Sequence, residues 1–158
     1  MPVSTITAWR ITHEKYADTA FSGEGANEYG GRFNSVGTPI VYTAESLSLA
    51  TLELLTKINE RRRLKHRVCI PLTFGEEHVL NRDENNLPEG WDERPYGPVS
   101  QKVGDEWVRS SESLVLRVPS VVLPHEHNYL LNPQHPLIDE LDIGTPEPLH
   151  LDPRVLPE

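Results

Sequence analysis

Residues 39–59 read PIVYTAESLSLATLELLTKIN, and this stretch contains a predicted strand followed directly by a predicted helix. A proline opens residues 39–44, whose alternation predicts a short strand with Tyr42 on the same face as apolar neighbours. Ser46 is expected to cap the helix, because its hydroxyl can accept a hydrogen bond from a free amide of the first turn. We expect this helix to run to about Asn59. Its leucines spread round the circumference, which predicts that neighbours cover it on several sides.

The flanking sequence predicts three more strands and one more helix. The strands are expected at residues 3–12, 68–74 and 114–122, which are rich in residues that favour extended structure. Pro98 is expected to open a helix that ends near residue 110, and its apolar seam consists of Val99, Val103 and Trp107.

Two long loops separate these elements. Residues 23–37 hold five of the ten glycines, and residues 75–98 are polar, with Trp91 as the expected anchor. A length of 158 residues is typical of one compact domain, and a hydrophobic content of 37% is enough for a packed core. We therefore expect residues 1–158 to form a single domain.

Charge and cysteine content exclude several classes of protein. The formal net charge of -9 disfavours attraction to a nucleic-acid backbone. Five of the fifteen basic residues lie within residues 61–67, where interaction with the dipole of the preceding helix is a better explanation than a binding patch. The single cysteine, Cys69, excludes an internal disulfide, and no signal peptide or membrane span is recognisable. These features predict a cytoplasmic protein without membrane association.

The segment Gly30-Gly31-Arg32-Phe33-Asn34 is a candidate phosphate-binding loop. Glycines allow close approach of the backbone to a ligand, and the planar guanidinium of Arg32 suits two phosphate oxygens. A glycine-rich turn carrying a surface arginine is the alternative explanation, since neither GxGxxG nor GxxxxGK[ST] occurs.

Two further polar residues occupy unexpected positions. Glu53 lies near the apolar side of the predicted helix. A carboxylate in such a position must be ion-paired, protonated, solvated at a cleft or functional. Arg10 or Arg32 could form the ion pair with it. Ser120 follows the apolar alternation of its predicted strand and is expected on the buried face. A structural role is the alternative for Ser120, because no GxSxG motif occurs.

Other side chains are less decisive. Tyr42 either packs in the core or stacks on a flat ring of a ligand. His125, His127 and His135 lie among prolines without HExxH or a cysteine partner, so we expect loop contacts and no metal site.

The order of these motifs resembles the RES-domain toxins. The resemblance covers nearly the whole chain and rests on residues 30–34, 41–46 with Leu52-Glu53, Val118-Pro119-Ser120, and Asn132-Pro133 with His135-Pro136. That family is named after an arginine, a glutamate and a serine, and the matching residues are Arg32, Glu53 and Ser120. Phe33 departs from the pattern, which commonly shows tryptophan at this position.

The resemblance implies an α+β fold similar to ADP-ribosyltransferases, with a mixed β-core and peripheral helices. It also implies the toxin of a type II toxin-antitoxin system that depletes NAD and is restrained by an Xre-type antitoxin. NAD would be the substrate, and no cofactor is expected. The sequence leaves a homodimer open.

On this basis the predicted catalytic residues are Arg32, Tyr42, Glu53 and Ser120. The predicted NAD-binding residues are Arg10, Gly31, Arg32 and Tyr42. The carboxylate of Glu53 would stabilise the positive charge that develops on the ribose as nicotinamide leaves. The acceptor stays open between water, inorganic phosphate and a protein side chain. A noncatalytic protein-binding domain, in which the same residues form a buried polar network, is the alternative of a different class.

Overall fold

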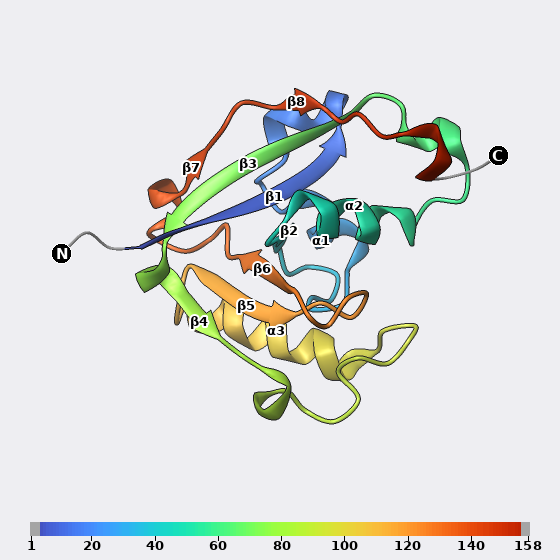
Figure 1. Ribbon diagram of the computed structural model, residues 1–158. Coiled ribbons are helices and arrows are strands. Elements are labelled where there is room, and N and C mark those ends of the chain that lie inside the picture. Colours follow the sequence, from blue (N-terminus) through green and yellow to red (C-terminus); the bar gives the residue numbers. More distant parts are fainter. Residues whose placement is uncertain (1–3, 156–158) are drawn as a thin grey trace.

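The computed structural model describes residues 4–155, which form one curled β-sheet with helices at its periphery (Figure 1). The strands are β1 (Thr5–His13), β2 (Val41–Ala44), β3 (Arg67–Gly75), β4 (Val79–Asn81), β5 (Val115–Pro119), β6 (His127–Leu131), β7 (Asp142–Ile143) and β8 (Glu147–Pro148). The α-helices are α1 (Glu24–Tyr29), α2 (Leu47–Leu55) and α3 (Pro98–Ser110). Short 3-10 turns lie at Glu14–Thr19, Arg61–Leu64, Glu76–His78, Glu84–Asn86, Ile138–Glu140 and Pro153–Val155.

The sheet has the strand order β4-β5-β6-β2-β1-β3-β7, and β8 also pairs with β3. The two longest strands, β1 and β3, pair antiparallel from Thr5 opposite Gly75 to His13 opposite Arg67. The short strand β2 lies between β1 and β6, but its register with β1 consists of a single pair, Trp9 opposite Ala44. The strands on either side of β2 therefore diverge, and side chains of β1 have access to its backbone.

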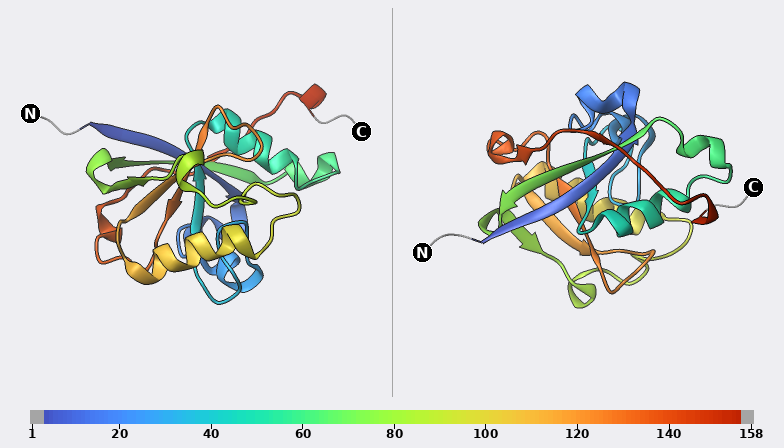
Figure 2. Two further views of the ribbon diagram at one scale, coloured as in Figure 1. Left: turned by 90° about the horizontal axis from the view of Figure 1, so that it is seen from below. Right: turned by 45° about the horizontal axis from the view of Figure 1, so that its top comes forward.

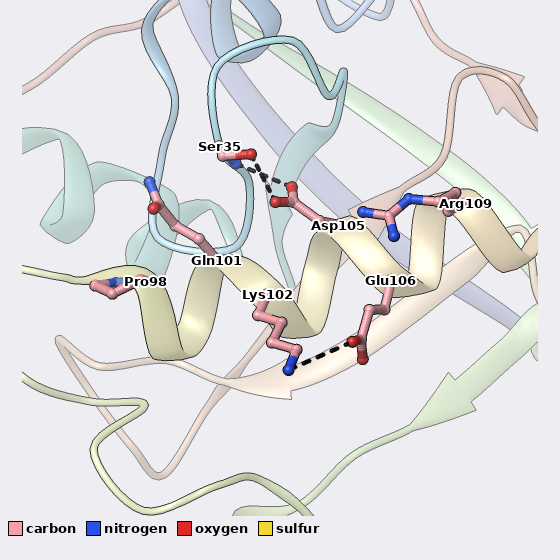
Figure 3. A pocket seen from close by; sticks show the side chains of 7 residues that line it. All are labelled: Ser35, Pro98, Gln101, Lys102, Asp105, Glu106 and Arg109. Carbon is pink, nitrogen blue, oxygen red and sulfur yellow. Dashed lines mark hydrogen bonds and ion pairs between the residues drawn. The ribbon is translucent and has the colours of Figure 1, made fainter.

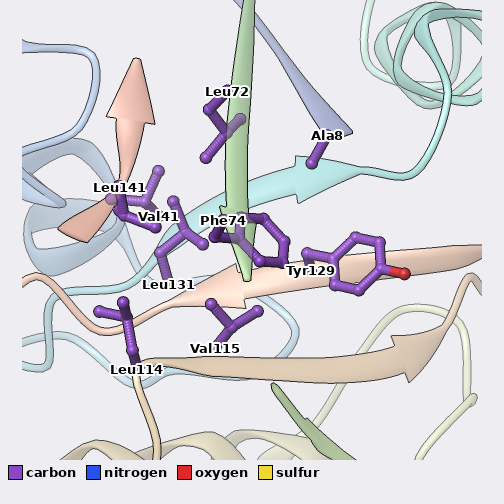
Figure 4. Packing of buried hydrophobic residues seen from close by; sticks show 9 residues of the cluster. All are labelled: Ala8, Val41, Leu72, Phe74, Leu114, Val115, Tyr129, Leu131 and Leu141. Carbon is purple, nitrogen blue, oxygen red and sulfur yellow. The ribbon is translucent and has the colours of Figure 1, made fainter. Parts of the chain in front are cut away.

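The buried side chains form three hydrophobic clusters, two of which include side chains that contact β2. Val41 belongs to a cluster that also contains Phe74, Tyr129 and Leu131, which Figure 4 shows packed between strands. Its neighbour Tyr42 packs against the second cluster, which is built from side chains of β5, β6, α3 and the loops. In the left view of Figure 2, α2 and α3 lie on opposite sides of the strands. The two faces of β2 thus contact different layers of the molecule.

Several sequence predictions are confirmed. The strand predicted at 3–12 is β1 over its described part, whereas Val3 lies outside the described residues. The predicted helix after Pro98 is α3, and Trp91 is buried as an anchor against the ring of Phe33 at a centroid distance of 6.3 Å. The α+β class and the peripheral position of the helices are as expected.

The helix predicted to run from Ser46 to Asn59 is shorter. Ser46 caps it as predicted, by accepting a hydrogen bond from the amide of Leu49, but α2 ends at Leu55. The Thr56 hydroxyl and amide both donate to the carbonyl of Glu53, and this tight final turn ends the helix. The basic segment therefore begins beyond the end of α2.

The prediction that α2 is covered on several sides is wrong. Within the helix only Leu49 and Thr51 are buried, and Leu52 is 41% exposed. The helix lies on the outside of the sheet and contacts β1 and β2. One face is covered by strands, and the leucines of the other face meet solvent.

The predicted loops contain short regular elements. The glycine-rich segment 23–37 includes α1, whose N-cap Gly23 has the positive φ of 78° that glycine adopts without strain. The segment 75–98 includes β4, which pairs in parallel with β5. The strand predicted at 114–122 ends at Pro119, because the chain turns there and the Ser120 amide bonds the carbonyl of Glu126. Among residues 4–155, no helix is long and apolar enough to cross a membrane.

Candidate functional site

A cluster around one carboxylate joins α2, β6 and the turn after β5. The Ser120 hydroxyl donates to Oε2 of Glu53 at 2.8 Å, and Nδ2 of Asn128 donates to Oε1 at 2.9 Å. The same amide nitrogen donates to the carbonyl of Thr43 in β2 at 3.2 Å. Both oxygens of Glu53 are therefore fixed by neutral hydrogen-bond donors, and we call Glu53, Ser120 and Asn128 the carboxylate cluster.

Local structure holds the hydroxyl of this cluster in place. Ser120 is fully buried, and its oxygen accepts hydrogen bonds from the amides of Val122 at 3.1 Å and Leu123 at 3.2 Å. Two accepted bonds leave its own proton for Glu53, because a hydroxyl has one proton to donate. The serine is thus oriented by the turn that follows β5.

Burial dominates the electrostatics of Glu53. Desolvation raises the pKa of this carboxyl, while the hydrogen bonds from Ser120 and Asn128 act in the opposite direction. The ion pair with Arg10 or Arg32 that the sequence suggested does not form among the described residues, and the charge of Lys57 lowers the pKa of Glu53 less than the two hydrogen bonds do. A desolvated carboxylate with neutral partners interacts strongly with any positive charge placed beside it.

Arg32 lies in a tight turn between Gly31 and Asn34, whose backbones form a bridge. Nη1 of Arg32 donates to the carbonyls of Trp91 at 3.0 Å and Glu93 at 2.9 Å, so one end of the guanidinium is fixed. The ring of Tyr96 lies 5.9 Å from the guanidinium carbon. Nε and Nη2 of Arg32 have no hydrogen-bond partner within residues 4–155, and Arg32 forms no ion pair there, although the negative charge of Asp92 acts on the guanidinium.

The Tyr42 hydroxyl is bonded to the same turn. It accepts a hydrogen bond from the Phe33 amide at 3.0 Å and donates to Oδ1 of Asn34 at 2.6 Å. Burial raises the pKa of Tyr42, so this phenol stays protonated. A β-carbon at Gly31 would lie 2.8 Å from the Tyr42 oxygen, which is too close for any residue except glycine. Gly31 is therefore needed to bring the turn against β2.

Arg10 is the second cation of the region. Its Nη1 donates to the Tyr42 carbonyl at 3.0 Å, but its buried Nε has no hydrogen-bond partner within the described chain. Desolvation lowers the pKa of Arg10 to about 10, and the group remains charged at neutral pH. A buried guanidinium without an anion is costly, which is typical of a site that receives an anionic ligand.

These groups meet along two consecutive residues of β2. The Tyr42 carbonyl binds Arg10, the Tyr42 hydroxyl binds the turn that carries Arg32, and the Thr43 carbonyl binds Asn128 of the carboxylate cluster. The structure brings Glu53 and Ser120 into direct contact. It places Arg10, Gly31 and Arg32 around Tyr42 instead, without a direct bond from either arginine to Glu53.

Comparison with known proteins gives this arrangement a family. The RES domain model matches residues 7–152, which is most of the chain. The chain belongs to the RES domain family. It is 37% identical over 125 residues to a protein of Photorhabdus laumondii named Toxin Res, a match that covers 79% of this chain and 80% of that protein. It is 39% identical over 137 residues to a Sphingobium protein named Prs ADP-ribosylating toxin, covering 84% of this chain and 85% of the relative.

The fold of this RES domain is also found in a solved structure. A chain of the Mycobacterium tuberculosis MbcT-MbcA toxin-antitoxin complex superposes with a TM-score of 0.76 and 18% sequence identity. The match covers 93% of this chain and 85% of that chain. The α+β architecture is therefore shared despite low identity.

Sequence reasoning missed two polar residues of this RES domain. Asn128 is not among the predicted site residues, although it directly precedes the three buried residues of β6 and shares a face with Leu130. Asn34 was quoted only as part of the glycine motif, yet its Nδ2 donates to the carbonyls of Ala26 and Thr38 at 2.7 and 2.8 Å. For Asn128 the available signal was an asparagine directly before the apolar residues of β6, whereas the burial of Asn34 could not be inferred from its neighbours in the sequence.

The histidines do not gather into a metal site. His127 bonds Oε1 of Glu45 at 3.0 Å, and Nδ1 of His135 accepts the Leu137 amide. Within residues 4–155, no group of three or more His, Cys, Asp or Glu side chains is placed to hold a metal ion.

A separate hollow of about 310 Å³ lies on the outer side of α3 (Figure 3). Its lining residues are Ser35, Pro98, Gln101, Lys102, Asp105, Glu106 and Arg109. None of the predicted site residues lines it. The hollow is lined by Ser35, which follows the Arg32 turn, and by Gln101 and Asp105, which bond this segment from α3.

Proposed function

We propose that this RES domain is a toxin that cleaves the bond between nicotinamide and ribose in NAD. The proposal rests on one observation: a desolvated carboxylate and two guanidiniums that donate to carbonyl oxygens are linked to the same two residues of β2. Arg10 bonds the Tyr42 carbonyl directly, and the Tyr42 hydroxyl bonds the turn that carries Arg32. Glu53 is linked to the Thr43 carbonyl through Asn128. NAD carries the complementary charges, since its pyrophosphate is anionic and its nicotinamide ribose becomes cationic as the bond breaks.

Binding of the dinucleotide follows from the free donors. Arg10 and the unbonded edge of Arg32 would hold the pyrophosphate through charge-assisted hydrogen bonds, which fix position as well as affinity. Gly31 would act indirectly, because the absence of its side chain lets the turn that carries Arg32 lie against Tyr42. Because the Tyr42 hydroxyl is occupied by the turn, its ring is the part that would contact the nicotinamide.

Cleavage would leave the bonding electron pair on nicotinamide, which departs as a neutral base, so no general acid is required. Glu53 would stabilise the oxocarbenium-like ribose, and Ser120 and Asn128 would hold the carboxylate in place. The oxygen of water forms the new bond to the ribose carbon, and its proton passes to solvent. The products are nicotinamide, ADP-ribose and one proton.

A toxin of this kind requires a partner that restrains it. The similar fold comes from a toxin-antitoxin complex, which supports an antitoxin as the partner of this protein. We propose an Xre-type antitoxin that covers the groups around β2, encoded beside this gene. Inspection of the neighbouring genes tests the type of partner. Co-purification of the two products tests the complex, and failure to bind would exclude that partner.

Incubation of the purified protein with NAD, with and without inorganic phosphate, tests the reaction. Free nicotinamide together with ADP-ribose is the expected result. A phosphorylated ADP-ribose product would make the protein an NAD phosphorylase, and unchanged NAD would contradict the proposal. Arg32→Lys is expected to lose much of the activity while remaining folded, because a point charge lacks the guanidinium fork. Arg109→Lys, on the exposed side of α3, is the matched control.

Transfer of ADP-ribose to a protein is a second candidate function. The relative from Sphingobium that is 39% identical to this chain is named Prs ADP-ribosylating toxin. In this reaction a nucleophilic side chain of the target replaces water, and nicotinamide leaves as before. Incubation with labelled NAD and with Prs, the target in the name of that relative, distinguishes the two functions. Label on Prs supports transfer, whereas label only in free ADP-ribose supports hydrolysis.

A further inference from the structure

The helix α3 contacts the turn that carries Arg32 through three residues on one face. Nε2 of Gln101 donates to the carbonyls of Gly31 at 3.2 Å and Asn34 at 3.1 Å, which lie on either side of Arg32. One turn of helix later, Asp105 accepts hydrogen bonds from the Ser35 amide at 2.9 Å and the Ser35 hydroxyl at 2.6 Å. A spacing of four residues places both side chains on the same face of a helix.

Between these two residues, the helix backbone itself lies against the turn. A β-carbon at Gly104 would lie 1.6 Å from the carbonyl oxygen of Phe33, so only glycine permits this approach. Figure 3 shows Asp105 pointing to Ser35, whereas Lys102 and Glu106 point to the other side of the helix, where they form an ion pair with each other. The contact therefore uses Gln101, Gly104 and Asp105, and the neighbouring exposed side chains Lys102 and Glu106 provide internal controls.

We propose that Gln101 and Asp105 are positioning residues for the arginine that binds the substrate phosphates. The bonds of Gln101 bracket Arg32 in the chain, and those of Asp105 hold the residue after the turn. Without them the turn loses its hydrogen bonds to α3 and keeps its contacts to Tyr42, the bonds of the Asn34 side chain and the bonds of Nη1 of Arg32 to two carbonyls. Arg32 would then sample positions in which its free edge no longer faces the pyrophosphate. This inference rests on the proposed function for its substrate.

Substitution of the two residues should change substrate affinity more than the chemical step. Asp105→Ala and Gln101→Ala are each expected to raise the KM for NAD by about tenfold to a hundredfold, because small misplacements of a binding group have effects of this order. The kcat should stay within about twofold, since binding energy is lost equally from ground and transition states. A purely structural role would lower kcat with the folded fraction and leave KM unchanged.

Matched controls and a double-mutant cycle define the outcome. Lys102→Ala and Glu106→Gln, at exposed positions of α3 that do not bond the turn, should leave both constants unchanged. In the background of Arg32→Ala, Asp105→Ala should cause no further rise in KM, because the two act through one contact. The proposal would be overturned if Asp105→Ala raised KM by the same factor with and without Arg32→Ala. It would also be overturned if Asp105→Ala alone left KM unchanged. If Asp105→Ala does not fold, Asp105→Asn, which keeps an acceptor oxygen, should show a smaller rise in KM.

Hydrogen exchange separates failure of this inference from failure of the proposed function. Exchange at the amides of Gly31 and Phe33, which bond Asn34 and Tyr42 and not α3, should accelerate in both alanine variants. If the unaltered protein does not consume NAD, the proposed function fails while accelerated exchange still shows that α3 holds the turn. Unchanged exchange at both amides would refute the positioning role whatever the substrate.

Discussion

The carboxylate cluster and the two arginines differ in how their charged groups are partnered. Each oxygen of Glu53 receives a hydrogen bond from a neutral side chain, and the partner Ser120 is itself fixed by two backbone amides. Arg10 and Arg32, in contrast, donate only to carbonyl oxygens and leave other nitrogens unbonded within the described residues. The carboxylate is thus fixed in one position, whereas each guanidinium keeps nitrogens that could bind an anion.

Loss of the negative charge in the carboxylate cluster should have the largest effect. Glu53→Gln is expected to lower kcat by about a hundredfold to a thousandfold, which is the usual effect of removing one preorganised electrostatic contact. Stability should change little, because the substitution also removes a desolvated charge. Nicotinamide release and thermal unfolding measure the two effects. Glu106→Gln serves as the control, and near-normal turnover in Glu53→Gln would exclude the proposed role.

Removal of the buried cation should affect binding without weakening the fold. Arg10→Met is expected to lower the affinity for NAD by about tenfold to a hundredfold, which corresponds to one or two charge-assisted hydrogen bonds. The free energy of unfolding should stay within about 1 kcal/mol, because an unpaired buried charge is removed together with its bond to Tyr42. Calorimetric titration and urea denaturation test both statements. Strong destabilisation with unchanged affinity would assign Arg10 a structural role.

Displacement of the turn that carries Arg32 should have a smaller effect than loss of Arg10. It should lower both the stability of the fold and the affinity for NAD. Gly31→Ala places a β-carbon 2.8 Å from the Tyr42 oxygen and 2.9 Å from Oδ1 of Asn34, so the turn must shift. We expect a loss of about 1–3 kcal/mol in stability, which is typical of overpacking, and weaker NAD binding. Gly25→Ala, where a β-carbon meets nothing within 4 Å, should be tolerated. Equal behaviour of the two variants would contradict the close contact at Gly31.

The smallest effect is expected in the pH dependence of turnover. Burial raises the pKa of Glu53, and the ionised form is the one that stabilises a cationic ribose. The kcat should therefore fall as the pH drops through this raised pKa, at a higher pH than for an ordinary glutamate. The Ser120 hydrogen bond lowers the pKa, so the acid limb should move further upward in Ser120→Ala. An unmoved or downward-shifted limb would show that another group controls it.

The same shift predicts a pH dependence of stability. A carboxyl whose pKa is higher in the folded state stabilises the protein fully below the unfolded value, and this contribution is lost as the pH rises through the folded pKa. In Glu53→Gln, the part of the stability loss with rising pH that is due to this carboxyl should be absent. Urea midpoints measured across the acid range for the unaltered protein and the variant test the sign.

Local sequence patterns were sufficient to predict most elements and several site residues. Ser46 was identifiable because capping depends on neighbouring amides, and Ser120 because strand alternation placed a hydroxyl on the buried side. Glu53 stood out as a carboxylate among leucines. These signals are all read within one element, so they need no knowledge of the tertiary structure.

Contacts between distant segments were not predictable in the same way. The bond from Arg10 to the Tyr42 carbonyl forms because β1 and β2 diverge after a single pair, and no local pattern encodes this divergence. Asn128 joins Glu53 across 75 positions of the chain. The exposed side of α2 was also missed, since its apolar composition gives no information on how many neighbours surround it.

A crystal structure of the Glu53→Gln protein with bound NAD tests the central claim most directly. We expect the pyrophosphate oxygens of NAD to lie within hydrogen-bond distance of both Arg10 and Arg32, with the nicotinamide ribose beside residue 53. A dinucleotide bound in the hollow on α3, or a pyrophosphate in contact with neither arginine, would contradict it.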